Sequence, residues 1–324
     1  MHEQTLTSIL TCDERKGDDK LVGDEVWNPS LVAMKTMHKA LPCARQLSSS
    51  TMRSLSVPQL LRLKLPGELD AWKRAGFARN SDGEDIALGI GGVDIGVYSH
   101  RGHRGTHGDP ASWGWADGPL TRDMEDMPRP AAWEDLHENG WTEVDIDGIS
   151  TSIDDLSRGA YDELLRERAY FAEEHPNCAT SIYSVAVTTP DIHRTIAAFV
   201  SAGLELRKLA DPSPFSATLS MAFFKFGAPK NDVLLELVAP REPGAPVNLP
   251  GLPAIRGGRD APAEIAGLVV TVPCLDAVRR ALGAEHLGRA RPAVQGKGRM
   301  IAPLCHERVD LPLPLAFITP PREA

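Results

Sequence analysis

One carboxylate stands out in the sequence because its neighbours are all apolar. Glu236 lies in the run VLLELV, residues 233–238, which is aliphatic and predicts a strand. On the inward face of such a strand, in an apolar cleft, a carboxylate has a raised pKa and can act as a general base. The alternative is structural, because a buried carboxylate can also pair with an arginine or lysine on a neighbouring strand. Both interpretations remain open from the sequence.

A second polar group precedes a strand near the C-terminus. Gln295, Lys297 and Arg299 lie in PAVQGKGRMIA, a glycine-rich segment. Amide and cationic groups of this kind could bind a carboxylate, a phosphate or an acyl-carrier head group. An ordinary basic surface hairpin is the alternative. Phe224, in MAFFKFG, is predicted to contribute to the core and to the wall of the cleft.

Three histidines invite a metal interpretation that the surrounding residues oppose. His100, His103 and His107 occur in SHRGHRGTHGD. The segment has no carboxylate at ligand spacing, and Arg101 and Arg104 would repel a cation. The pattern therefore predicts a solvated loop.

These residues are positioned by a repeated order of elements. Residues 181–240 predict a strand, a helix with an apolar stripe that ends at Gly203, and three further strands, in the order β-α-β-β-β. The same plan follows from Glu264, and a weaker copy follows from Leu60. Because first strands recur near residues 60, 184 and 267, we predict three structural repeats.

Two of these stretches carry a family resemblance. SVAVTTPDIHRTIAAFVSAGLELR followed by LLELVAP, and AGLVVTVPCLDAVRRALG followed by LPLPLAFITP, resemble the vicinal oxygen chelate (glyoxalase/bleomycin resistance/dioxygenase) superfamily and its glyoxalase-like subgroup. The resemblance implies an α+β fold, in which β-α-β-β-β units pair into curved mixed sheets around a cleft. It also implies a divalent metal held by His, Glu or Gln from the first and last strands of each unit.

The chain departs from that ligand pattern. The first-strand ligand position of the central unit falls at Ser184, and the last-strand position at Glu236. The corresponding positions of the final unit fall near Gly267 and Ala316. One ligand in four is a poor metal site, because affinity depends on ligand number and geometry. We therefore predict no metal ligand and disfavour a divalent metal as cofactor, with Ser184 expected to contact the substrate.

The domain organisation follows from composition. Residues 1–56 predict a disordered leader, and the Ser- and Arg-rich part from Met34 has the composition of a transit peptide. Residues 57–118 predict a divergent unit, and residues 119–178 an acidic linker that could hold a helix. Residues 179–324 predict paired units at 179–240 and 263–320. The expected compartment is the cytoplasm, or a mitochondrion or plastid if translation begins at Met34.

Charge limits the partners. The net charge is −9, and residues 117–174 carry 17 acidic and 5 basic side chains. An acidic chain argues against a nucleic-acid partner, and no run approaches the ~18 apolar residues of a membrane span. Since three units are an odd number for a fold that closes in pairs, the unpaired sheet could be covered within the chain or in a homodimer.

Two functional hypotheses remain. The first is a glyoxalase-like protein that binds or converts a small oxygenated metabolite in the cleft; as an enzyme it would be lyase- or isomerase-like, and not a standard metal-dependent glyoxalase I. The alternative is a non-catalytic protein that sequesters a small molecule, or a partner-binding module. The absence of the usual ligand residues favours the second hypothesis, and Glu236 favours the first.

Overall fold

The computed structural model describes residues 59–78, 88–90, 93–98, 111–116, 141–154, 175–213, 216–226, 233–246, 255, 258–293 and 296–321. The predicted leader, the loop with His100, His103 and His107, and Gln295 lie outside the described residues.

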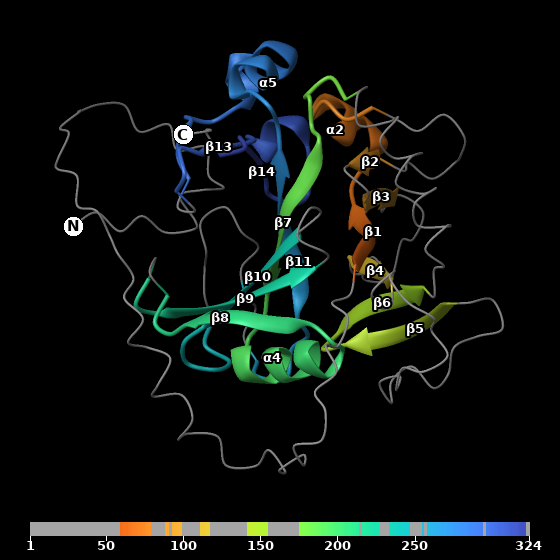
Figure 1. Cartoon of the computed structure of the whole chain (residues 1–324), viewed down its shortest axis with the longest axis vertical. Coiled ribbons are helices and arrows are strands. Elements are labelled where there is room, and N and C mark those ends of the chain that lie inside the picture. Colours follow the sequence, from red (N-terminus) through yellow and green to blue (C-terminus); the bar gives the residue numbers. More distant parts are fainter. Residues whose placement is uncertain are drawn as a thin grey trace. The chain divides into compact units, whose positions relative to one another are not determined.

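Two mixed sheets form the framework (Figure 1). The first has six strands, in the order β2 (Leu88–Ile90), β3 (Val93–Tyr98), β1 (Gln59–Pro66), β4 (Ser112–Ala116), β6 (Ile149–Asp154) and β5 (Trp141–Ile146). The second has eight, in the order β12 (Arg291–Pro292), β13 (Met300–Pro303), β14 (Leu315–Ile318), β11 (Glu264–Thr271), β7 (Ser181–Thr188), β10 (Val233–Pro240), β9 (Leu219–Phe226) and β8 (Glu205–Ala210). The three α-helices described are α2 (Leu69–Arg74), α4 (Ile192–Ser201) and α5 (Leu275–Leu282).

The eight-stranded sheet consists of two β-α-β-β-β units, as predicted. In each unit the last strand runs parallel to the first, β10 beside β7 and β14 beside β11. The two first strands, β7 and β11, are antiparallel neighbours, so they join the units into one continuous sheet. The expected α+β fold class and the pairing of units are confirmed.

The six-stranded sheet contains two units, where the sequence predicted one. Strand β4 was expected to belong to the first unit, but it runs antiparallel to β1, whose parallel partner is β3. Instead, β4 is parallel to β6, and β6 pairs antiparallel with β5. These are the relations between the first, last and penultimate strands of a further unit. The first sheet therefore repeats the arrangement of the second, with β1 and β4 in the places of β7 and β11.

The prediction of a linker across residues 119–178 is consequently wrong for 141–154, which form the β5–β6 hairpin. Its turn is Asp147-Gly148, with φ of 55° and 90°. Asp-Gly is a preferred dipeptide of two-residue hairpin turns, because both positions need a positive φ. Ile149, Thr151 and Ile153 are buried at alternate positions of β6. The acidic composition of the segment concealed this alternation, since Glu143 and Asp145 occupy exposed positions of β5.

An aromatic cluster joins the two sheets. Trp113 and Trp115 of β4 have ring centroids 5.8 and 5.2 Å from that of Phe226 of β9, and Trp113 lies 5.8 Å from Phe199 of α4. The Trp113 indole donates a hydrogen bond of 2.7 Å to the hydroxyl of Thr151, so its polar N–H is satisfied within the core. The core between the sheets is therefore shared by residues from both halves of the chain.

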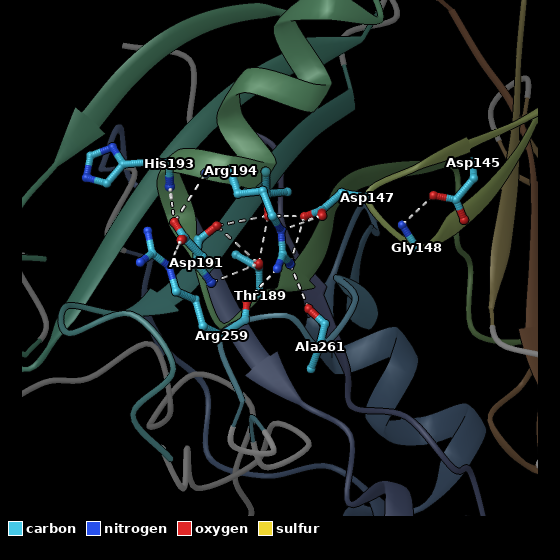
Figure 2. Close-up of polar contacts among 10 residues, drawn as sticks. Asp145, Asp147, Gly148, Thr189, Asp191, His193, Arg194, Arg259 and Ala261 are labelled. Atoms are coloured by element: carbon cyan, nitrogen blue, oxygen red, sulfur yellow. Dashed lines mark hydrogen bonds and ion pairs between the residues drawn. The ribbon is translucent and has the colours of Figure 1, made fainter. Parts of the chain in front are cut away.

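A polar network ties the β5–β6 turn to the start of α4 (Figure 2). Arg194 Nε lies 2.6 Å from Asp147 Oδ1, although its N–H is not aimed at that oxygen; the contact is thus an ion pair, supplemented by a hydrogen bond from Arg194 Nη2 to Oδ2 at 3.3 Å. Arg194 also donates to the carbonyl of Ala261 at 2.6 Å, and Thr195 donates to Asp147. Three segments far apart in sequence therefore meet at one arginine.

Asp191 completes the network by capping α4. Its side chain accepts hydrogen bonds from the backbone N–H groups of His193 and Arg194, at 3.1 and 3.2 Å, and pairs with Arg259 at 3.0 Å. Burial would raise the pKa of Asp191, but these hydrogen bonds and the guanidinium outweigh it and hold the pKa below its usual value. Because the acidic groups are all satisfied by protein donors, the network is structural.

Within the part of the chain that the structure describes, no helix is both long enough and apolar enough to cross a membrane.

Candidate functional site

The two faces of the eight-stranded sheet have different partners. On β9 and β10, Phe224, Phe226, Leu235 and Leu237 point into the core shared with the helices and the first sheet. The alternate residues point to the second face, which carries a separate apolar cluster. Its members are Leu219, Met221, Val238, Ile255, Ala266, Ala293, Ile301, Ala316 and Ile318, with Tyr183, Phe223 and Val269 packed against them. We refer to this side as the second face.

Glu236 lies on the second face near the centre of the sheet. It pairs with Ala186 of β7 on one side and with Phe223 of β9 on the other. Its side chain is buried, with 5% of the residue exposed. Among the described residues Glu236 forms no ion pair, so the structural alternative of a strand-to-strand salt bridge is not what the structure shows there.

The burial of Glu236 changes its acidity. Desolvation raises its pKa to about 7, and a hydrogen bond from the Ser184 side chain partly opposes this rise. A carboxyl group with such a pKa exchanges its proton near neutral pH, which is the property a general acid or base needs. Ser184 is itself 2% exposed and lies on β7, next to β10.

A bulge in β7 brings the neighbouring tyrosine to the same face. The register between β7 and β11 pairs Ser184 with Val269 and Ile182 with Val270, so it passes over Tyr183. Bulges re-aim side chains in this way and are frequent beside functional sites. Ile182 points into the shared core, whereas Tyr183 packs on the second face. Two consecutive residues, Tyr183 and Ser184, thus lie beside Glu236.

Arg299 covers Tyr183. Its guanidinium carbon lies 5.6 Å from the centroid of the tyrosine ring, a cation–π contact. Burial raises the pKa of Tyr183, the positive charge of Arg299 lowers it, and the charge of Glu236 raises it; the net direction is upward. The tyrosine therefore keeps its proton and can donate a hydrogen bond at neutral pH.

The predicted site residues are only partly brought together. Glu236, Ser184 and Arg299 share the second face. Phe224 is fully buried on the opposite face, with its ring centroid 5.5 Å from that of Phe199, because it is one residue out of step with Phe223. Lys297 is exposed, with a φ of 57°, in the turn that leads to Arg299.

The four positions at which the family resemblance implies metal ligands can be compared in the register. Glu236 pairs with Ala186, and Ala316 pairs with Val269, so Glu236 and Ala316 occupy equivalent places in the two units. Alanine and glycine supply no ligand atom from a side chain. In the described part of the chain no group of three or more His, Cys, Asp and Glu residues could hold a metal ion. Of the side chains at these four positions, only those of Glu236 and Ser184 carry an oxygen atom that could act as a ligand.

Two residues of the second face escaped the sequence interpretation. Strict alternation along a strand would turn Tyr183 away from Ser184, and only the bulge brings both to one face. Arg291 pairs with Ile301, and Ile301 with Ile318, both of the second-face cluster, so Arg291 faces the same side. Strand β12 has two residues, which is too short for a pattern to reveal it.

Comparison with solved structures finds low similarity to several enzymes. A methylmalonyl-CoA epimerase from Mycobacterium tuberculosis has 16% identity and a TM-score of 0.31, over 44% of this chain and 90% of that one. A Streptomyces coelicolor methylmalonyl-CoA epimerase variant in complex with 2-nitronate-propionyl-CoA has 13% identity and a TM-score of 0.30, over 44% and 97%. A mutant 4-hydroxymandelate synthase from the same organism has 11% identity and a TM-score of 0.46, over 83% and 94%.

No protein-family model matches the sequence, and no curated protein matches it.

Proposed function

We propose that the second face of the eight-stranded sheet binds a small oxygenated metabolite, and that Glu236 acts on it as a general base. The observation that carries this proposal is a buried carboxyl without an ion pair among the described residues, whose pKa of about 7 suits proton transfer at neutral pH. A carboxyl kept only for stability would normally be paired, because burying it alone costs free energy.

The neighbouring residues supply complementary roles. The Ser184 hydroxyl orients the carboxylate of Glu236 and stabilises its ionised form. Tyr183, which keeps its proton, can donate a hydrogen bond to a substrate oxygen as negative charge develops there. Arg299 adds a positive charge beside that tyrosine. We infer that the usual metal site of the superfamily is degenerate here, so the proton transfer is assigned to side chains alone.

The test is proton exchange at carbon. We expect the wild-type protein in D2O to exchange the acidic C–H of at least one member of a panel of 2-oxo acids and acyl thioesters. The exchange is measured as the loss of the ¹H NMR signal of that C–H. Glu236→Gln should reduce the exchange rate by about 10²–10⁴, the usual contribution of a general base. Glu264→Gln is the matched control, because Glu264 lies on β11 of the same sheet but is exposed. Equal rates for Glu236→Gln and wild type would overturn the assignment.

A non-catalytic binding protein is the second candidate, and the lack of ligand residues at the four equivalent positions favours it. In that case a ligand raises the melting temperature of the protein without being converted, and elemental analysis finds no bound metal. Stoichiometric Fe, Mn, Ni or Zn in the purified full-length protein would count against both candidates, since both assign binding to side chains.

A further inference from the structure

Arg291 is the least explained charged residue of the second face. Its Nε and Nη2 atoms are buried and have no hydrogen-bond partner. Among the described residues it forms no ion pair with a carboxylate. Burial lowers its pKa, with no opposing contribution from a neighbouring acid. The residue as a whole is half-buried and its guanidinium stays protonated, so what the structure leaves without an acceptor is this pair of N–H donors, which costs free energy unless something pairs with them.

The two unpaired atoms are a specific pair. Nε and Nη2 form one edge of the planar guanidinium, and their N–H bonds point the same way. This edge matches the two oxygens of a carboxylate or a phosphate in a bidentate contact. The two donors that lack a partner are therefore the same pair of N–H groups, here called the fork, with which an arginine binds an oxyanion.

The register places this fork on the side where Glu236 lies. Arg291 pairs with Ile301 and is two residues from Ala293. Ile301 and Ala293 both belong to the second-face cluster, so Arg291 lies on that side. In the sheet order, β12 and β10 are separated by five strand intervals of about 4.8 Å each, so the fork is not in contact with Glu236. Arg299 lies between them, since it precedes β13 and reaches Tyr183 on β7.

We propose that Arg291 is an oxyanion-binding residue that holds a carboxylate or phosphate at one end of an extended ligand, while the other end lies at Glu236. This rests on the proposed function only in requiring that the ligand occupy the second face. It narrows the proposed metabolite to one that is part of an elongated, anionic ligand spanning the strands from β12 to β10, and it excludes small neutral carbonyl compounds. Arg299 is then the second cation along the path of the ligand.

The experiment uses the full-length protein and three probes: acetate, inorganic phosphate and the neutral analogue acetamide. Binding is followed by the ¹⁵Nε resonances of arginine at constant ionic strength. We expect one arginine resonance to shift saturably with acetate or phosphate and not with acetamide. Arg291→Lys, which keeps the charge but loses the fork, should remove that resonance and weaken binding at least tenfold. Tighter binding of acetate would identify a carboxylate ligand, and tighter binding of phosphate a phosphorylated one.

Arg280→Lys is the matched control, because Arg280 is an exposed arginine of α5 and should leave anion binding unchanged. Saturable binding of equal strength in wild type and Arg291→Lys, or binding of acetamide as tight as that of acetate, would overturn the proposal, as would a wild-type protein in which no arginine resonance responds. Glu236→Gln is expected to keep the anion response, so loss of proton exchange in that variant and loss of anion binding in Arg291→Lys report separately on the two proposals.

Discussion

Glu236 and Ser184 meet on neighbouring parallel strands, and the serine side chain is the hydrogen-bond partner of a carboxyl that the sheet buries. The serine provides one hydrogen bond, which is less than an ionised carboxylate loses on leaving water. Desolvation therefore dominates and the pKa of Glu236 rises. An unfavourable burial that persists in a folded protein is more easily explained by a role in binding or catalysis than by stability.

The stability of the protein should depend on the ionisation of Glu236. Its pKa is about 7 when folded and about 4.5, the ordinary value of a glutamate, when unfolded. Below pH 4 both states are protonated and Glu236 has no effect. As the pH rises from 4.5 to 7, the unfolded chain loses the proton that the folded chain keeps, so the free energy of unfolding decreases, by an amount on the order of 3 kcal/mol, and stays lower above pH 7.

Glu236→Gln removes this dependence. We expect the variant and the wild type to have similar free energies of unfolding at pH 4.5 and the variant to be more stable at pH 8, by urea denaturation. Glu264→Gln, the exposed control, should show no such difference. A Glu236→Gln protein that is less stable than wild type at pH 8 would contradict the raised pKa.

Ser184→Ala should raise the pKa of Glu236 further, because the hydroxyl favours the ionised carboxylate. Hydrogen bonds to charged groups contribute about 1.5–3 kcal/mol, so an upward shift of about one unit or more is expected. The ¹³C carboxyl resonance of labelled glutamate measures it directly. Ser220→Ala is a suitable control, since Ser220 is buried in the same sheet but donates to Asp211. An unchanged or lower pKa in Ser184→Ala would show that the hydroxyl does not stabilise the carboxylate.

The Asp147–Arg194 contact should contribute more to stability than a surface ion pair. The two side chains are 9% and 32% exposed, and Arg194 also holds the Ala261 carbonyl. Replacing Arg194 with Met leaves Asp147 with the Thr195 hydroxyl but no cation and removes a donor from the Ala261 carbonyl, and we expect a loss of about 2–3 kcal/mol in the free energy of unfolding.

Arg207→Met is the matched variant for that measurement. Arg207 pairs with Glu205 at 3.0 Å, but both side chains are about half exposed. Such pairs contribute about 1 kcal/mol or less, because water already solvates the charges. Equal losses for Arg194→Met and Arg207→Met would mean that the network at the start of α4 does not tie the β5–β6 turn to the helix.

Much of the fold could be predicted because local patterns carry it. The apolar runs of β7, β10 and β11, and the stripe of α4, follow from the alternation and the 3.6-residue period that burial on one face imposes. The position of Glu236 in an aliphatic strand was also enough to predict its burial, because its neighbours along the strand leave few ways to solvate it.

The count of units was not decided by local pattern. Residues 112–116 read as a strand in any arrangement, and only the direction of pairing shows that β4 begins a unit instead of ending one. Pairing direction depends on which distant strand lies alongside, which a short sequence does not record. In the acidic stretch the Asp147-Gly148 dipeptide indicates a hairpin turn, whereas the net negative charge of the stretch indicates a solvated linker.

The sequence by itself determined the repeated β-α-β-β-β plan and one buried carboxyl. The tertiary structure determined which residues surround that carboxyl. A bulge at Tyr183 turned two successive side chains to one face, and the turn before β13 carried Arg299 over the tyrosine ring. Strand pairing placed Arg291, with its unpaired Nε and Nη2, on the same side. Such placements arise from contacts between residues far apart in the chain, and the physical reason they escape a sequence pattern is that a one-residue shift in register exchanges the two faces of a strand.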